Sequence, residues 1–507
     1  MESLPPEILL LIGQNITDRS SIRALTECCW QFRHIFQPLY YSSIEIKKFS
    51  PKYHIPLVKH LYQRPDLARK VSFARFTWST TCDGHDADHN AHESDEGDED
   101  HDYHYDHDDH YEYDRVERLT LSTMNFIHDT LNLWLLDENL EHDDDPEGWR
   151  AGWEFHLFLG CSAAWIGLLI AKLTHVERLE LCYHGQFDLM HQMLSRAVKR
   201  QNPFHFRTPF PLLQEVKLSC SYDNSWIHSH DALPFFYLPA VRVVEADGIC
   251  ETHNDPLFSD NRSILDFSGN DKPVSQVRAI KVSRAYNFVD MEEWIKACTK
   301  LEYLEVEAEI TAWDISENYH FDAPTFRESL LLAKDTLKTI RFSFGKRLIQ
   351  DRPGVFSPRA FDLNGLDNIP FGSFKEFHVL ENLSIRYRNL SSRTFANLLP
   401  SSLKTLEIID IKSKSFSRIM WNLAHLVESR GSFPNLNRIV LKHLGFSGKT
   451  RNEVDVDERS ITGLDDPWVS GLGLGDLSIY LKNTCMDAGV SIKIYWSRVF
   501  DWGYLGF

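Results

Sequence analysis

Histidine and carboxylate side chains are concentrated in one segment of the chain, Asp83–Asp114. It holds 15 Asp or Glu residues and seven histidines, with no Lys or Arg. Imidazole and carboxylate groups are ligands for Zn²⁺, Ni²⁺ and Cu²⁺. A metal site of fixed ligand number needs a folded frame, however, and an acidic low-complexity run repels itself and stays solvated. The segment is therefore predicted to be a disordered insert, with weak multivalent metal binding at most and no defined metal site.

A second pattern with chemical potential is Gly471-x-Gly473-x-Gly475, which precedes an expected helix over 476–487. Glycine-rich turns before helices can cradle phosphate, but they follow a strand, and Trp468-Val469 is too short to be one. A turn is expected instead. The sequence contains no HExxH, GxSxG or Walker motif and no spaced set of metal-ligand cysteines. We expect no catalytic residue and no cofactor; an enzyme with an unrecognised site stays open as one hypothesis.

Length and composition describe a soluble protein with more than one core. The chain has 507 residues, of which 43% are hydrophobic and 25% are charged. This length suits several domains or one extended array. The formal net charge of −19 falls to about −4 without the acidic insert. The charge total therefore says little about what the folded part binds.

Cysteine usage and hydropathy indicate an intracellular chain, cytoplasmic or nuclear. The nine cysteines are scattered and form no CxxC pair, which favours reduced thiols. The N-terminus lacks the basic region of a signal peptide. The apolar run over 157–171 has 15 residues, which is short for a membrane span. It is predicted to be a buried helix, and no membrane partner is expected.

The first forty residues predict three short helices. Pro5 and Pro6 suit a helix start, and Glu7 favours the positive end of its dipole. Asp18 or Ser20 is expected to cap a second helix with Ile22 and Leu25 inward, and Pro38 is expected to stop a third. So small a unit buries little apolar surface, so its exposed apolar residues suggest a docking surface.

These residues also carry a family resemblance. The opening Leu4-Pro5-x-Glu7-Ile8, the following Leu11-Ile12, the Cys28/Cys29-x-x-Phe32 segment and the closing Pro38-Leu39-Tyr40 resemble an F-box. In that family the motif binds a Skp-family adaptor, which joins it to a cullin-based ubiquitin ligase. The resemblance implies adaptor contacts at Leu4, Pro5, Ile8, Leu11, Ile12, Leu25 and Pro38. The alternative is that these helices only cap the end of a repeat array.

Most of the remaining chain repeats one pattern, apolar-x-x-apolar-x-apolar. The last two apolar positions point the same way from a strand, and helix-like stretches such as 189–200, 291–298, 417–429 and 476–487 separate many of the copies. Ten copies are clear, and weaker ones occur at Val71-Phe73 and Ile492-Ile494. The clear copies are Val116-Leu119-Leu121, Val176-Leu179-Leu181, Leu213-Val216-Leu218, Val241-Val244-Ala246, Val277-Ile280-Val282, Leu301-Leu304-Val306, Leu337-Ile340-Phe342, Leu380-Leu383-Ile385, Leu403-Leu406-Ile408 and Leu436-Ile439-Leu441.

Strand followed by helix, many times over, predicts an α/β fold: a three-helix F-box and then a leucine-rich-repeat-like solenoid, with parallel strands on the concave face and helices outside. The irregular spacing, and the segment over 371–385, resemble those of fungal F-box proteins. A doubly wound α/β enzyme shares the alternation but would need a glycine-rich phosphate loop. The expected domains are an F-box over 1–45, a linker with a first capping repeat over 46–82, the acidic insert over 83–114 and the solenoid over 115–507. Six tryptophans are expected in the helical layer: Trp134, Trp153, Trp165, Trp294, Trp313 and Trp421.

The residue between each apolar pair is predicted to line the concave face, and its charge alternates along the series. Opposite charges on neighbouring strands would then stand side by side, about 4.8 Å apart. Such a face suits a mixed-charge protein partner and not nucleic acid, whose phosphates need a basic stripe. The concave-face candidates are Glu180, Lys217, Glu245, Lys281, Glu305, Arg341 and Glu407, with the uncharged Thr120, Ser384 and Val440 in the same series.

Together these features predict a non-enzymatic substrate receptor of an SCF-type ubiquitin ligase. The F-box would bind the Skp-family adaptor and, through it, the cullin core, and the repeats would hold an unknown target protein close to the ligase. The main alternative is a repeat scaffold for protein interactions with no ligase role.

Overall fold

The structure is a computed structural model that describes twelve stretches of the chain: residues 4–79, 119–135, 146–184, 187–220, 227–250, 274–285, 291–308, 323–344, 370–390, 394–411, 415–443 and 475–495. The predictions for the acidic insert, Val116, Trp313, Gly471, Gly473 and the segments between these stretches lie outside the described residues. The chain divides into two compact units. The first comprises Met1–Gln214, Ser219–Ser225 and Leu238–Ala240, and the second comprises Glu215–Leu218, Trp226–Tyr237 and Val241–Phe507.

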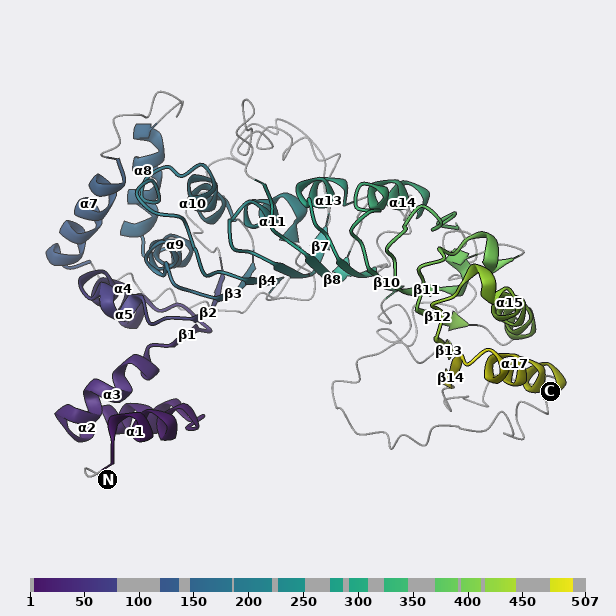
Figure 1. The fold of residues 1–507 in the computed structure, drawn as a ribbon. Helices are drawn as coiled ribbons and strands as arrows, with labels where there is room; N and C mark the ends of the chain where they lie inside the picture. The colour runs from purple at the N-terminus through teal and green to yellow at the C-terminus, as the bar shows by residue number, and fades with distance from the viewer. Residues whose placement is uncertain are drawn as a thin grey trace, which may run out of the picture. The chain divides into compact units, whose positions relative to one another are not determined.

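The first unit begins with three helices and continues into alternating strands and helices (Figure 1). Strands β1, β2 and β3 pair in parallel, with Ile44 beside Ala74 and Phe76 beside Leu181. Helix α9 packs against β2 and against helices α4, α8 and α10. The elements are α1 (Pro6–Gln14), α2 (Arg19–Cys28), α3 (Trp30–Tyr40), β1 (Ser43–Ile46), α4 (Pro51–Gln63), α5 (Pro65–Ala68), β2 (Phe73–Ser79), α7 (Leu121–Leu135), α8 (Pro146–Phe158), α9 (Ser162–Lys172), β3 (Arg178–His184) and α10 (Asp188–Val198).

Two repeat copies predicted in this unit were placed wrongly. Leu121 begins helix α7 instead of a strand, because Ile127, Leu131 and Trp134 recur at helical spacing and are all buried. Thr120 therefore does not lie on a strand. The weak copy was predicted to end at Phe73. In the structure Ala74 and Phe76 are the buried pair of β2, so the copy that starts at Val71 ends at Phe76.

The apolar run over 157–171 was predicted to be one buried helix, but it is divided between the end of α8 and most of α9. The prediction is confirmed for α9. Residues Ala163 to Ile170 are all buried in the protein. In the described part of the chain no single helix is long and apolar enough to cross a membrane. The pair Gly148–Phe158 and Ser162–Lys172 passes that test of length and composition only when taken together, and it is bent by 109°.

The second unit carries the regular part of the repeat. Its strands from β6 to β14 follow one another across the sheet in chain order, and each of these pairings is parallel. A doubly wound fold reverses its strand order at a switch point, and this order does not. The strands are β4 (Glu215–Cys220, of which 215–218 belong to this unit), β6 (Val243–Asp247), β8 (Ala279–Ala285), β9 (Tyr303–Ala308), β10 (Thr339–Phe344), β11 (Asn382–Arg386), β12 (Thr405–Ile411), β13 (Arg438–His443) and β14 (Ser491–Tyr495), with a separate short pair β5 (Ile227–His228) and β7 (Ile249–Cys250).

The predicted apolar pairs stand in register across this sheet. Leu304 lies beside Ile340, which lies beside Leu383, and the row continues through Leu406 and Ile439. These five side chains are all buried. A two-residue rhythm puts both members of each pair on one face, so stacking the strands forms a continuous apolar core.

Helices cover the face of the sheet that carries these apolar side chains. Helices α11 (Ser229–Phe236), α13 (Glu292–Ala297) and α14 (Ala323–Leu331) follow one another along it (Figure 1). Helices α15 (Phe416–Glu428) and α17 (Gly475–Asp487) pack together further along. Only 23 residues separate Leu383 from Leu406, and this short repeat has the 3-10 turns η3 (Tyr387–Leu390) and η4 (Phe395–Asn397) where others have an α-helix. A third turn, η6 (Arg430–Ser432), precedes β13.

Four of the predicted tryptophans, Trp134, Trp153, Trp165 and Trp294, are buried. Trp421 is not, since 51% of it is exposed on α15. Its neighbours Met420 and Leu423 face the core, so helical geometry turns Trp421 outward.

Candidate protein-binding surfaces

The three N-terminal helices form a small core of their own. Leu9, Ile22, Phe32 and Phe36 are buried together, and Phe32 and Phe36 meet edge to face with ring centroids 5.4 Å apart. Gly13 allows α1 to lie close to α3, because a Cβ there would come within 2.7 Å of Leu39 and Phe36 side-chain atoms. The packing therefore fixes which side of α1 faces inward.

The outward side of α1 carries three of the predicted adaptor contacts. Ile8, Leu11 and Ile12 are 43%, 55% and 42% exposed, and Pro5 is exposed next to them. Leu9 and Gly13 occupy the opposite, buried side. The result is an apolar helix face of Ile8, Leu11 and Ile12, hereafter the α1 patch.

The other predicted adaptor contacts lie elsewhere. Leu4 and Leu25 are half-buried and pack against the small core. Pro38 is half-buried within α3, so the prediction that it stops this helix was wrong. Pro38 lies in the last turn, where its missing N–H costs the helix a single hydrogen bond, and the helix ends two residues later at Tyr40.

Asp18 is the N-cap residue of helix α2, as predicted. Its carboxylate accepts the backbone N–H groups of Ser20 at 3.3 Å and Ser21 at 2.9 Å, and both serine hydroxyls at 2.6 Å. The hydroxyls of Ser20 and Ser21, then their N–H groups, lower the pKa of Asp18 from 3.8 to about 2. These bonds act on the charged carboxylate, so they stabilise α2 only while Asp18 is ionised.

We expect the cap to fail only under strongly acidic conditions. Because the folded pKa lies below the unfolded one, the stabilisation is complete above about pH 4 and is lost as the pH falls through 2. Carbon NMR of aspartate carboxyl groups in the full chain should give Asp18 a titration midpoint near pH 2. A midpoint near pH 4 would show that the cap does not form in solution.

The second candidate surface is the sheet face opposite the helices, hereafter the open face. In the second unit, Glu245, Lys281, Glu305, Arg341, Ser384 and Glu407 occupy the positions between buried apolar residues on successive strands, and Lys217 occupies that position on β4. In the first unit, Glu180 occupies it on β3. The structure thus puts the predicted residues at equivalent places on their strands.

The predicted ladder of opposite charges forms only in part. Lys281 and Glu245 are ion-paired at 2.5 Å. Glu305 instead accepts the hydroxyl of Tyr303 on its own strand, and Arg341 lies over the Tyr303 ring, 5.9 Å from its centroid. Tyr303 therefore takes the place of the predicted Glu305–Arg341 ion pair, and the charges in the sequence alone do not predict this contact.

Glu180 also has unforeseen partners. Arg178 and Arg75 donate to its two carboxylate oxygens, at 2.6 Å for Arg178 Nη2 and 2.5 Å for Arg75 Nε. Burial alone raises the pKa of Glu180, but these hydrogen bonds outweigh it, so the pKa lies below its usual value. Arg75 lies beside Glu180 on the neighbouring strand β2, which the sequence reading had placed in a different register.

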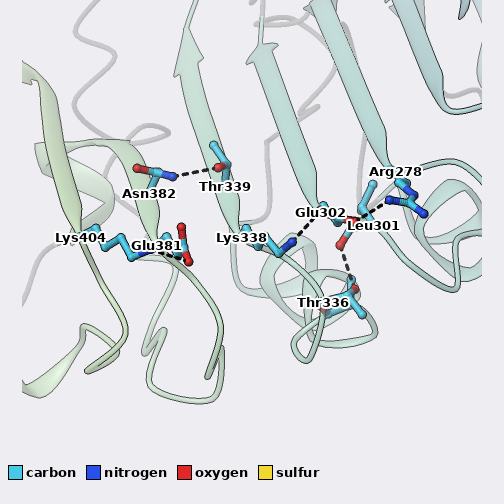
Figure 2. Close-up of polar contacts among 10 residues, drawn as sticks. Arg278, Leu301, Glu302, Thr336, Lys338, Thr339, Glu381, Asn382 and Lys404 are labelled. Carbon is cyan, nitrogen blue, oxygen red and sulfur yellow. Dashed lines mark hydrogen bonds and ion pairs between the residues drawn. The ribbon is translucent and has the colours of Figure 1, made fainter. Parts of the chain in front are cut away.

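Opposite charges do pair across neighbouring strands at the start of the strands. Glu302 pairs with Arg278 at 3.4 Å and with Lys338 at 2.8 Å, and Glu381 pairs with Lys404 at 2.8 Å (Figure 2). The backbones connect these residues too, since each N–H donates to the carbonyl of the equivalent residue one repeat earlier, at 2.7–2.9 Å. The sequence signal of these pairs was the charged residue directly after the first apolar position, which most of the repeats have.

A hollow of about 430 Å³ lies on the open face between β9 and β14. Its lining includes the predicted Arg341 and Glu407 together with Tyr303, Ser384, Arg438 and Lys442. Lys442 forms an ion pair with Glu407. The sequence reading did not single out Arg438, which lies one residue before the buried Ile439 and, like Arg341, on the open face.

Near this hollow, strands β11 and β12 are joined by a buried ion pair. Arg386 Nε donates to Asp410 Oδ2 at 2.6 Å, and the two side chains are 7% and 8% exposed. Asp410 has a φ of 54° at a bulge in β12, and Arg284 has a φ of 52° at an equivalent bulge in β8, where it pairs with Asp247 at 2.6 Å. Both bulges turn a charged side chain toward the preceding strand.

Comparison with known protein families agrees with this architecture. A family model described as a leucine-rich repeat domain matches residues 135–446, more than half of the chain. The chain belongs to the leucine-rich repeat family. No curated protein matches the sequence significantly.

The leucine-rich repeat assignment covers the regular strands from β3 to β13 and suggests a scaffold for protein interactions. The matched range does not include the three N-terminal helices. In the described stretches, no group of three or more His, Cys, Asp or Glu side chains is arranged to hold a metal ion.

Proposed function

We propose that this leucine-rich repeat protein is a substrate receptor of an SCF-type ubiquitin ligase. Its N-terminal helices bind a Skp-family adaptor, which connects it to the cullin core, and its repeats bind a target protein. The chain performs no chemistry itself; it holds the target close to the ligase. The observation that carries the proposal is the α1 patch.

The α1 patch supports the proposal because it is apolar, contiguous and not needed by the small core. Leu9, Ile22, Phe32 and Phe36 complete that core without Ile8, Leu11 or Ile12. Apolar side chains left on one side of a short helix are typical of a helix that docks on a partner. The F-box resemblance of residues 4–40 names the partner class that fits.

The repeats support the second half of the proposal. Their open face presents paired and unpaired charges, tyrosines and hydroxyls over several strands of one sheet. A surface of mixed charge suits a protein better than a phosphate backbone. The alternative, a repeat scaffold with no ligase role, shares this surface and differs only in what the N-terminal helices do.

Replacing Leu11 by glutamate should weaken adaptor binding strongly. Leu11 is the most exposed residue of the α1 patch, so the charge does not disturb the small core but would be buried in the complex. Loss of a central apolar contact is worth about 2 kcal/mol or more, which is roughly a 30-fold weaker Kd. Purified full-length chain and a purified Skp-family adaptor, measured by titration calorimetry, check this.

The matched control is Leu133→Glu, which puts the same charge on an exposed leucine of α7 in the same unit. It should bind the adaptor like the unchanged chain. If the unchanged chain binds no adaptor, or if both variants lose binding equally, the scaffold alternative is correct.

A further inference from the structure

The hollow on the open face has a local charge unlike that of the whole chain. Three cations, Arg341, Arg438 and Lys442, and one carboxylate, Glu407, line it. Glu407 is already paired with Lys442. Two guanidinium charges are therefore left over within a chain whose formal net charge is −19.

These two arginines differ from several other cations at the ends and faces of the strands. Arg278, Lys338 and Lys404 each have a carboxylate within 3.4 Å, and Lys281 has Glu245. Within the described stretches, neither Arg341 nor Arg438 has a carboxylate within ion-pair distance, and both are exposed. Since neither guanidinium group is held by a carboxylate of the described stretches, both are available to an outside anion.

Neutral donors complete the lining. Thr339, Asn382 and Thr405 lie side by side on β10, β11 and β12, and the Asn382 amide donates to the Thr339 hydroxyl at 3.2 Å. Arg341 and Arg438 lie on β10 and β13, three strand spacings and two residues along the strand apart, which is about 16 Å at the backbone. Long arginine side chains on such strands can converge on one anion or hold two anions about four extended residues apart.

We propose that this hollow binds an anionic side chain, carboxylate or phosphate, of an extended segment of a protein partner. Arg341 and Arg438 recognise the anion, because a guanidinium group donates two parallel hydrogen bonds to either group. The hydroxyls and the amide between them hold the flanking peptide. The inference rests on the proposed role of the repeats in holding a protein, and it names the class of segment that they hold.

The charge around the hollow argues against a nucleic acid as occupant. Glu305 lies beside Arg341 on the neighbouring strand, and Glu407 lies within the lining. A continuous phosphate backbone would have to pass these carboxylates, whereas a single acidic side chain need not. The site therefore favours isolated negative charges on an otherwise neutral chain.

The test measures binding of three fluorescein-labelled ten-residue peptides of Gly and Ser to the full chain by fluorescence anisotropy. One peptide carries two glutamates four residues apart, the second carries two phosphoserines at those places, and the third carries two glutamines. The glutamate or the phosphoserine peptide should bind at least tenfold more tightly than the glutamine peptide. Whichever of the two binds more tightly identifies the source of the anion.

Arg341→Ala with Arg438→Ala should weaken that binding at least tenfold. The control Arg278→Ala with Lys338→Ala removes the same charge from the ladder at the start of the strands, and it should change the Kd less than twofold. Equal losses in both double variants would overturn the proposal. So would equal binding of all three peptides, or tighter binding of a ten-nucleotide single-stranded DNA.

This assay contains no adaptor, and Leu11→Glu should bind the anionic peptide like the unchanged chain. Failure of the peptide assay therefore leaves the adaptor proposal standing. Failure of adaptor binding likewise leaves the hollow and its ligand class standing.

Discussion

The Asp410→Ala variant is expected to lower the stability of the second unit by about 3–5 kcal/mol. Its partner Arg386 is only 7% exposed, so removing the carboxylate takes the ion-pair partner from a guanidinium group inside the protein. The cost comes mainly from the buried charge that loses its ion pair, because the net gain from an intact buried pair is small. Hydrogen exchange of the unchanged strands β11 and β13, followed by mass spectrometry, measures the opening free energy on both sides of β12.

Two further variants separate charge from backbone strain at this position. Asp410 has a φ of 54°, which glycine adopts without strain. Asp410→Gly should still be strongly destabilising, because Arg386 is left buried without its carboxylate. Arg386→Met combined with Asp410→Gly should recover most of the loss, since it removes both charges and the strain.

The exposed ladder provides the matched control. Glu302→Gln breaks two ion pairs at the start of β9, yet it should cost less than about 1 kcal/mol because these side chains are in contact with water. If Asp410→Ala cost no more than Glu302→Gln, the Arg386–Asp410 pair would not be buried as described.

The second large effect is expected in the first unit, at Trp165. Its indole is fully buried, stacks on Phe126 with ring centroids 6.3 Å apart, and donates from Nε1 to the Leu157 carbonyl at 3.1 Å. Trp165→Ala should cost about 3–5 kcal/mol, because it opens a large cavity where α9 meets its neighbours. Hydrogen exchange of α9 and β2 measures the loss.

Trp165→Phe and Trp421→Ala test the reason for that loss. Phenylalanine retains the stacking but cannot donate to Leu157, so it should cost about 1–3 kcal/mol. Trp421 is half-exposed on α15, and its replacement by alanine should cost clearly less than Trp165→Ala. A Trp165→Ala variant with unchanged exchange in α9 would contradict the buried position of this helix.

The apolar rhythm of the sequence was enough to predict the sheet. Leu304, Ile340, Leu383 and Leu406 were aligned by pattern alone, and the structure puts them beside one another. A parallel strand covered by helices on one face must bury every second residue there, so burial imprints the pattern directly on the sequence. This is why the fold class and most strand positions followed from the residues.

The pattern failed where another interaction outweighed it. Leu121 fits the apolar pattern, but the helical spacing of Ile127, Leu131 and Trp134 extends much further along the chain. The charge ladder predicted along the open face was interrupted because Tyr303 binds both Glu305 and Arg341. Pairing between strands depends on side-chain reach and on hydroxyl groups, and neither can be read from the signs of charges.

Much of the candidate site was also only partly visible in the sequence. The F-box resemblance drew attention to residues 4–40, but packing decides which of them face outward, and Leu4 and Leu25 face the core. Arg438 and Lys442 belong to a hollow that exists only because β9 to β14 lie side by side. Such a site depends on how neighbouring strands are aligned, so the sequence of a single repeat does not predict it.

The central claim is that residues 4–40 bind an adaptor while the repeats stay free for another protein. Hydrogen exchange of the full chain, with and without a purified Skp-family adaptor, tests it most directly. We predict slower exchange confined to the N-terminal helices, strongest in α1, with strands β6 to β14 unchanged. Slower exchange in those strands, or no change anywhere at saturating adaptor, would contradict the account.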